Sequence, residues 1–245
     1  MSCETITRRN LPHWCVPCAI HFVTFRLAGS LPRDVIDGLK QRRRELLSKA
    51  SAGVSASEHR QRAHKLLFAA YDDYLDSHRQ IDWLLDPRIA ALVRSSLYHL
   101  HGKKIVLWAY SIMPNHVHAL FAPMLGAENE RQALDDEIGE NEDRGPLAGI
   151  MHSLKGYTAH QANKILGRSG AFWQHESYDH WIRDENELER VVDYISANAV
   201  KAQLAQRTTD WYWCSAHDRF LTDGDSTGWL NLPLPSDLAV QSKLE

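Results

Sequence analysis

The chain of 245 residues lacks any apolar run approaching the roughly 18 residues that a membrane-spanning helix needs. Its first residues, MSCETITRRNLPHW, lack the apolar core of a secretory signal peptide. Cysteine is scarce, and four cysteines without a secretory signal suggest a reducing compartment. We therefore expect a cytoplasmic protein with no membrane partner.

A strong charge imbalance is also lacking, because the formal net charge is −3. A basic domain is the usual footprint of a nucleic-acid-binding protein, so this balance weakens a DNA-binding hypothesis without excluding it. The charge is nevertheless uneven, with a basic run at Arg42, Arg43 and Arg44 and a strongly acidic segment at residues 126–145. The chain is long enough for one domain with additions or for two small domains.

The sequence has one C-x-x-C pair, Cys15 and Cys18, and no second pair of ligands at a spacing typical of zinc sites. A zinc site is therefore poorly supported. A thioredoxin-type redox motif would need a preceding strand and a helix that begins at the first cysteine. Here a strand-like segment, residues 19–27, follows the pair instead. We therefore favour neither chemistry for these cysteines.

Hydrophobic periodicity divides the rest of the chain into alternating helices and strands. The predicted strands are residues 20–27, 104–112, 116–121, 171–175 and 178–182. The predicted helices are residues 30–49, 58–79, 87–101, 147–166 and 185–204. The charged helical piece between residues 50 and 80 looks like an insertion into a smaller core, and the chain after residue 221 looks like a loosely ordered tail.

The stretch MPNHVHALF, residues 113–121, is the most informative one. On a strand, His116 and His118 point to the same face, whereas on a helix they would diverge. A second pair, His99 and His101, lies near the end of a predicted helix, so its rings diverge. The competing interpretation of the first pair is two structural histidines on a half-buried sheet face.

The predicted helix 147–166 has polar side chains along one edge of its apolar stripe. At 100° per residue, Tyr157, Gln161 and Lys164 all border the face that must pack against the core. Such a border is unusual for a purely structural helix. For Tyr157 alone, an amphipathic tyrosine with its hydroxyl at the rim is the competing interpretation.

Four motifs together resemble the REP-associated tyrosine transposases of the HUH single-strand transposase superfamily. They are MPNHVH, the SLKGYT of residues 153–158, FWQHESYDHWIRDENELERVVDYISANAVKAQL and the closing DWYWCSA. The resemblance spans residues 11–218, with the insertion at about 50–80 least typical and with tails at 1–10 and 219–245. Cys214 stands where the family usually has serine, and Ala199 where proline is common. The resemblance implies an α+β fold, with a ferredoxin-like or RRM-like antiparallel sheet backed by helices.

The resemblance also implies a chemistry. His116 and His118 would hold Mg²⁺ or Mn²⁺, with Gln161 as third ligand, and Tyr157 would attack the scissile phosphate to form a 5′-phosphotyrosine. Gln161 lies one helical turn after Tyr157, so both can address one point. The implied substrate is single-stranded DNA, folded as a hairpin or palindrome, and the protein is expected to be a monomer or a homodimer.

Basic and aromatic residues are candidates for DNA contacts. The candidates for the DNA backbone are Lys155, Lys164, Arg26, Arg42, Arg43 and Arg44. Trp173, Tyr178 and Trp181 could stack on bases, although packing in the core is the favoured interpretation.

Two other functions stay open. The first is a catalytically inactive or domesticated regulator that binds DNA hairpins on the same fold. The second is a hydrolase that uses a histidine-bound metal on another substrate, with Tyr157 structural.

Overall fold

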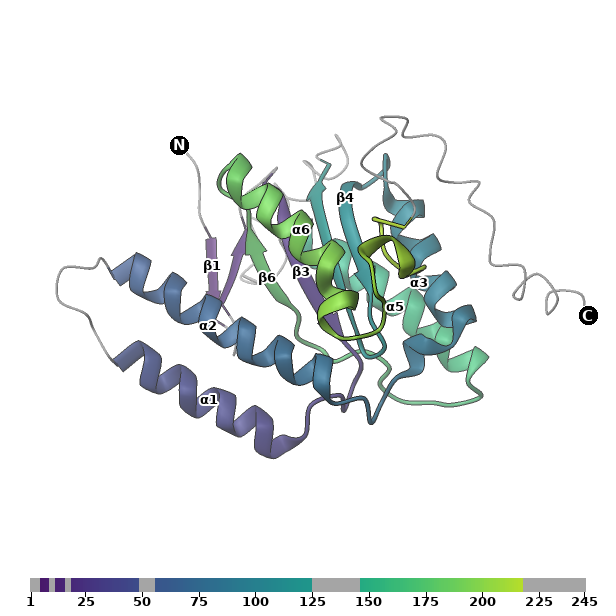
Figure 1. Cartoon of the computed structure of the whole chain (residues 1–245), viewed down its shortest axis with the longest axis horizontal. Coiled ribbons are helices and arrows are strands. Elements are labelled where there is room, and N and C mark those ends of the chain that lie inside the picture. The colour runs from purple at the N-terminus through teal and green to yellow at the C-terminus, as the bar shows by residue number, and fades with distance from the viewer. Residues whose placement is uncertain (1–4, 9–11, 16–18, 49–55, 125–145, 218–245) are drawn as a thin grey trace, which may run out of the picture.

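The structure is a computed structural model, and it describes residues 5–8, 12–15, 19–48, 56–124 and 146–217 (Figure 1). Its centre is a four-stranded antiparallel sheet in the order β4-β5-β3-β6. The strands are β3 (His21–Arg26), β4 (Ile105–Ile112), β5 (His116–Pro123) and β6 (Tyr178–Trp181). Two helices, α3 (Pro87–Leu100) and α5 (Pro146–Ile165), connect β3 to β4 and β5 to β6. This chain order and strand order are those of a ferredoxin-like fold, so the predicted α+β class is confirmed.

Local sequence signals explain where the helices begin and end. Asp86 caps α3 by accepting a hydrogen bond from the backbone of Arg88, with Pro87 in the first turn. Gly102, just past the end of α3, has a φ of +72°, which favours glycine. Asp184 caps α6 (Glu185–Lys201) in the same way through the backbone of Glu187.

Strand alternation separates two layers of core, one on each face of the sheet. Helices α3 and α5 cover one face, where their apolar stripes meet Val23, Phe25, Val117, Ala119 and Phe121. Helices α6 and α2 (Ala56–Ser77) cover the other face, where Phe22 and Leu120 pack against residues of both helices. Figure 1 shows α2 and α6 together in front of the sheet, with α3 and α5 to the right.

The segment predicted to be an insertion, residues 50–80, contains α2, and α1 (Arg33–Ser48) packs against α2 without burying any of its own residues. Two short strands that the sequence analysis does not predict, β1 (Thr5–Arg8) and β2 (Pro12–Cys15), form a separate antiparallel pair. Cys15 ends β2, and Cys18 lies outside the described residues. Two short 3-10 helices complete the described chain, η1 (Trp83–Leu85) and η2 (Thr208–Asp210).

The strand expected at residues 171–175 is wrong. Within it, Trp173 forms only an isolated bridge with Leu27, and Phe172 and Trp173 turn their rings into the core. The backbone of Gln174 donates a hydrogen bond to Arg26, so the segment follows the end of β3 only briefly. Among the described helices, none is both long enough and apolar enough to span a bilayer.

Candidate metal centre

The structure brings the two predicted histidines together at the start of β5. Their Nε2 atoms lie 3.0 Å apart, and both side chains are 0% exposed. Met113 closes the preceding turn by donating its backbone N–H to the carbonyl of His116. The pair therefore lies at a fixed position on the sheet face that α2 and α6 cover.

Hydrogen bonds at the Nδ1 atoms fix the orientation of both rings. Asn115 donates its amide N–H groups to the carbonyls of Leu75 and His78, so its oxygen is left to accept from Nδ1 of His116 at 2.6 Å. Nδ1 of His118 bonds the hydroxyl of Thr24, its cross-strand partner, at 2.7 Å. With its proton on Nδ1, His116 turns the lone pair of its Nε2 towards Nε2 of His118. In metal-ligating histidines, the ring nitrogen that does not bind the metal typically forms such a hydrogen bond.

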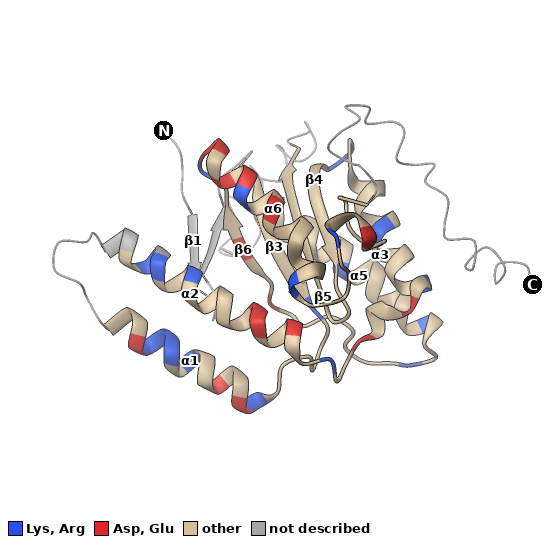
Figure 2. Cartoon of the chain, in the orientation of Figure 1, with Lys and Arg blue, Asp and Glu red and all other residues tan. Residues whose placement is uncertain are grey.

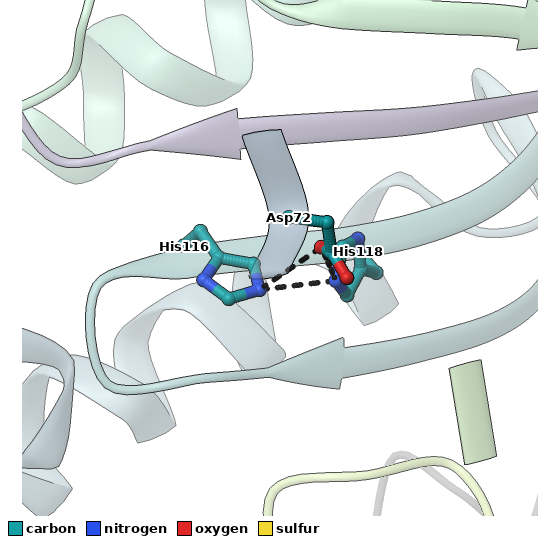
Figure 3. Close-up of side chains that lie close together, drawn as sticks. All are labelled: Asp72, His116 and His118. Atoms are coloured by element: carbon teal, nitrogen blue, oxygen red, sulfur yellow. Dashed lines mark hydrogen bonds and ion pairs between the residues drawn. The ribbon is translucent and has the colours of Figure 1, made fainter. Parts of the chain in front are cut away.

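A carboxylate from the insertion completes the group. Asp72 on α2 is 1% exposed, and its Oδ1 lies 3.2 Å from Nε2 of His118 and 3.9 Å from Nε2 of His116. Figure 3 shows the carboxylate aimed between the two rings. Oδ1 of Asp76, one helical turn further on, lies 4.0 Å from Nε2 of His116. Imidazole nitrogens with a carboxylate oxygen are a usual ligand set for divalent metals in proteins.

The charges in the centre suit a cation. Burial, followed by the neighbouring His118, lowers the pKa of His116 to about 3, so this imidazole is neutral at neutral pH. Burial raises the pKa of the Asp72 carboxyl, but hydrogen bonding and charge from His118 outweigh it and hold the pKa well below its usual range. A neutral imidazole at His116 and an ionised carboxylate at Asp72 are protonation states that suit metal binding.

Helix α6 adds two polar side chains that the sequence analysis did not select. The hydroxyl of Tyr194 donates a hydrogen bond to Oδ2 of Asp72. The amide nitrogen of Asn198 lies 3.1 Å from Nε2 of His118, and its buried Oδ1 has no hydrogen-bond partner among the described residues. Burial and the adjacent Asp72 carboxylate raise the pKa of Tyr194 well above its usual value.

Lys201, at the end of α6, joins the acidic side chains of α2. Its ammonium lies 3.2 Å from Asp72, 2.7 Å from Asp73 and 3.2 Å from Asp76. In Figure 2 the acidic residues of α2 gather in its second half, next to α6. Lys201 therefore balances part of the negative charge that α2 brings to the centre.

The structure does not bring Tyr157 or Gln161 to the histidines. Tyr157 is 56% exposed on α5, and no hydrogen bond joins either side chain to His116 or His118 in the described part of the chain. The reason is topological, since α5 packs against the face of the sheet opposite the histidine pair. Helical periodicity identifies the buried side of a helix but not the face of the sheet that this side covers.

Signals for the missed residues were present in the sequence. Tyr194 and Asn198 are four residues apart in DYISAN, the spacing that puts two side chains on one side of a helix. Asp72 belongs to the acid-rich run YDDYLD in the segment interpreted as an insertion. Nothing local in that run indicates that it reaches the histidines, 44 and 46 positions later in the numbering.

The other predicted site residues are dispersed. Arg26 is buried beside the centre, and Lys155 contacts the connection between α5 and β6. Lys164 is exposed near the end of α5. Figure 2 shows basic residues along α1, the helix that carries Arg42, Arg43 and Arg44. Trp173 is in the core and donates its indole N–H to Thr158 at 2.9 Å, as the core interpretation predicts.

Comparisons with known proteins show a similar curated protein and a similar solved structure. No protein-family model matches the chain. A putative REP-associated tyrosine transposase of Haemophilus influenzae is 26% identical over 117 residues, which are 44% of this chain and 57% of that protein. The chain thus matches little more than half the length of this relative. A solved structure of a REP-associated tyrosine transposase bound to a REP hairpin is 15% identical, with a TM-score of 0.48, over 90% of this chain and 92% of that chain.

Proposed function

We propose, from the confirmed resemblance to the REP-associated tyrosine transposases and from the buried centre, that this chain cuts and rejoins single-stranded DNA. One observation carries the proposal. The carboxylate of Asp72 is shared between Nε2 of His118, on one oxygen, and the hydroxyl of Tyr194, on the other. A metal-ligand set and a nucleophile are thereby joined through one side chain.

The donor atoms fit a divalent cation. His116 and His118 would hold it through Nε2, and Asp72 through Oδ1, an atom that is buried without a hydrogen-bond partner among the described residues. Asn198 offers a further orphaned oxygen next to them. We assign Mg²⁺ or Mn²⁺, the ions that the resemblance implies, because the carboxylate and amide oxygens beside the histidines suit them. The bound metal would act as a Lewis acid on the scissile phosphate.

Tyr194, and not Tyr157, is the nucleophile that we assign. Its phenol oxygen would attack phosphorus and break the bond to the 3′ oxygen, which leaves a 5′-phosphotyrosine and a free 3′-hydroxyl. The phenol proton would pass to Oδ2 of Asp72, the atom to which it is already hydrogen-bonded, and from there to the departing 3′ oxygen. A phenol of pKa about 10 is only ~0.1% ionised at pH 7, which corresponds to about 4 kcal/mol. The pKa of Tyr194 is raised further, so cationic help is essential.

The centre is closed to DNA in this structure, because the rings of His116 and His118 are fully buried beneath α2. A phosphodiester group can therefore reach the centre only through a rearrangement that keeps Asp72, which α2 carries, beside His118. The same burial favours a second candidate function, a regulator that binds DNA hairpins without cutting them.

The test is incubation with a labelled single-stranded hairpin and Mn²⁺, followed by a denaturing gel. Wild type and Tyr157→Phe should both give a covalent protein–DNA band. Tyr194→Phe and His116→Ala should give none. A band that is kept in Tyr194→Phe and absent in Tyr157→Phe would reject our assignment of the nucleophile. Hairpin binding without any band in the wild type would favour the regulator.

A further inference from the structure

We propose that Arg26 and Lys155 form a phosphate-binding subsite beside the metal centre, which holds a backbone phosphate of the DNA strand. The identity of the ligand as DNA rests on the proposed function. The existence of an anion site rests on the two side chains themselves.

The sheet register places Arg26 next to the centre. Arg26, the last residue of β3, is the antiparallel partner of His116 on β5. Directly opposed residues of neighbouring strands project to the same face, with Cβ atoms about 5 Å apart. An anion held by the guanidinium of Arg26 would therefore lie next to the histidine pair.

Arg26 is a buried cation that forms no ion pair with another described residue. It is 5% exposed, and its Nη1 donates long hydrogen bonds to the carbonyl of Leu27 at 3.4 Å and to the hydroxyl of Ser30 at 3.3 Å. The ring of Tyr71 lies 5.9 Å from its guanidinium carbon. These groups are neutral, whereas buried charges in proteins are normally paired with an opposite charge.

Lys155 approaches the same region from α5. Its ammonium donates to the carbonyl of His175 at 2.7 Å and to the hydroxyl of Ser177 at 3.3 Å, which are also neutral groups. Burial, followed by the charge of Arg26, lowers the pKa of Lys155 to about 8, and Glu176 only partly opposes this. Both cations also contact one short segment, because the backbone of Gln174 donates a hydrogen bond to the carbonyl of Arg26 and the next residue, His175, accepts one from Lys155.

Other cations near the centre are paired with acids. Lys201 contacts three carboxylates, and Lys65 contacts Glu187 at 3.0 Å. Within the described residues, neither Arg26 nor Lys155 lies within 4.0 Å of a carboxylate oxygen. An anion with several oxygens would relieve the repulsion and match both donors, and a phosphodiester group is such an anion.

The test measures binding of a labelled single-stranded oligothymidine by fluorescence anisotropy over a series of salt concentrations. A variant that no longer neutralises one phosphate should show a slope of log K against log salt that is smaller by about 0.7. We expect this reduction in Arg26→Gln and in Lys155→Gln. The matched control is Arg207→Gln, since Arg207 is exposed and paired with Asp210. It should keep the wild-type slope.

Thermal unfolding of the variants without DNA shows whether each variant still folds. Because Lys155 is a half-buried charge with no carboxylate oxygen within 4.0 Å among the described residues, Lys155→Gln should melt at the wild-type temperature or above it in the absence of DNA. A variant that loses DNA affinity while keeping its stability supports a ligand site. A Lys155→Gln variant that melts lower and binds DNA as the wild type does would make the lysine structural and overturn the proposal.

The outcomes separate the subsite from the transfer chemistry. A covalent adduct in the wild type with unchanged salt slopes in both variants would reject the subsite alone. Reduced slopes without any adduct would support the subsite and reject the transfer chemistry. Inorganic phosphate at matched ionic strength should not displace the oligothymidine. Displacement of the strand by phosphate in the wild type but not in Lys155→Gln would assign the site to free phosphate instead.

Discussion

The hydroxyl of Tyr194 donates a hydrogen bond to the carboxylate of Asp72, whose other oxygen lies 3.2 Å from Nε2 of His118. The tyrosine comes from α6, the aspartate from α2 and the histidine from β5. Three segments distant in sequence thus meet at one carboxylate. This arrangement links the proposed metal site, the proposed nucleophile and the position of α2.

Metal binding should stabilise the folded chain. At a free Mn²⁺ concentration about 100-fold above its dissociation constant, the free energy of unfolding should rise by about 2.7 kcal/mol, because only the folded state assembles the ligands. Calorimetry with Mn²⁺ and then with a chelator measures this gain. Asp72→Asn should lose most of it, whereas the exposed Asp73→Asn should keep it. An undiminished gain in Asp72→Asn would remove Asp72 from the ligand set.

Lys201→Met should destabilise the metal-free protein by about 1 to 3 kcal/mol, since it leaves the Asp72 carboxylate buried with one partner fewer. Mn²⁺ should recover part of this stability, because the metal supplies the positive charge that the lysine provided. The measurement is chemical denaturation with and without Mn²⁺. Lys40→Met, which alters an exposed pair with Asp37, is the control and should change little.

The dependence of the free energy of unfolding on pH should reveal the lowered pKa of Lys155. Burial and the charge of Arg26 lower its pKa in the folded protein from 10.5 to about 8. Between these two values the unfolded chain binds more protons than the folded one, so the free energy of unfolding gains a contribution that rises with pH. Denaturation across this range should show the rise in the wild type and a flatter profile in Lys155→Met. Identical profiles would mean that Lys155 titrates normally.

The Trp173→Phe variant should show whether Trp173 packs in the core or stacks on a DNA base. The substitution removes the hydrogen bond from the indole to Thr158 and part of a buried ring, so stability should fall by about 1 kcal/mol or more. The affinity for oligothymidine should stay unchanged, because the ring is buried in the core. Anisotropy and thermal unfolding on the same sample measure both. A loss of affinity without a loss of stability would contradict the core assignment.

Local sequence patterns predicted the elements and the histidine pair. The alternation in HVHALF places His116 and His118 on one face of a strand, and turn residues such as Pro87 and Gly102 mark the ends of α3. The order of elements was enough for the α+β class. These features depend on interactions between residues close together in the chain.

The composition of the centre could not be predicted in the same way. Periodicity gives the buried side of α5 but not the face of the sheet it covers, so Tyr157 was assigned to the wrong side of the molecule. Asp72 reaches the histidines only because α2 folds back over the sheet, a contact between distant segments. The orphaned oxygen of Asn198 is likewise visible only in three dimensions.

The most direct measurement identifies the residue that carries the DNA. Wild-type protein is incubated with single-stranded hairpin DNA and Mn²⁺, the adduct is digested with nuclease and protease, and mass spectrometry locates the nucleotide on a peptide. We predict a phosphotyrosyl link at Tyr194, within the segment Val191–Lys201 of α6. A link at Tyr157, or at any residue outside the centre formed by His116, His118 and Asp72, would contradict this account.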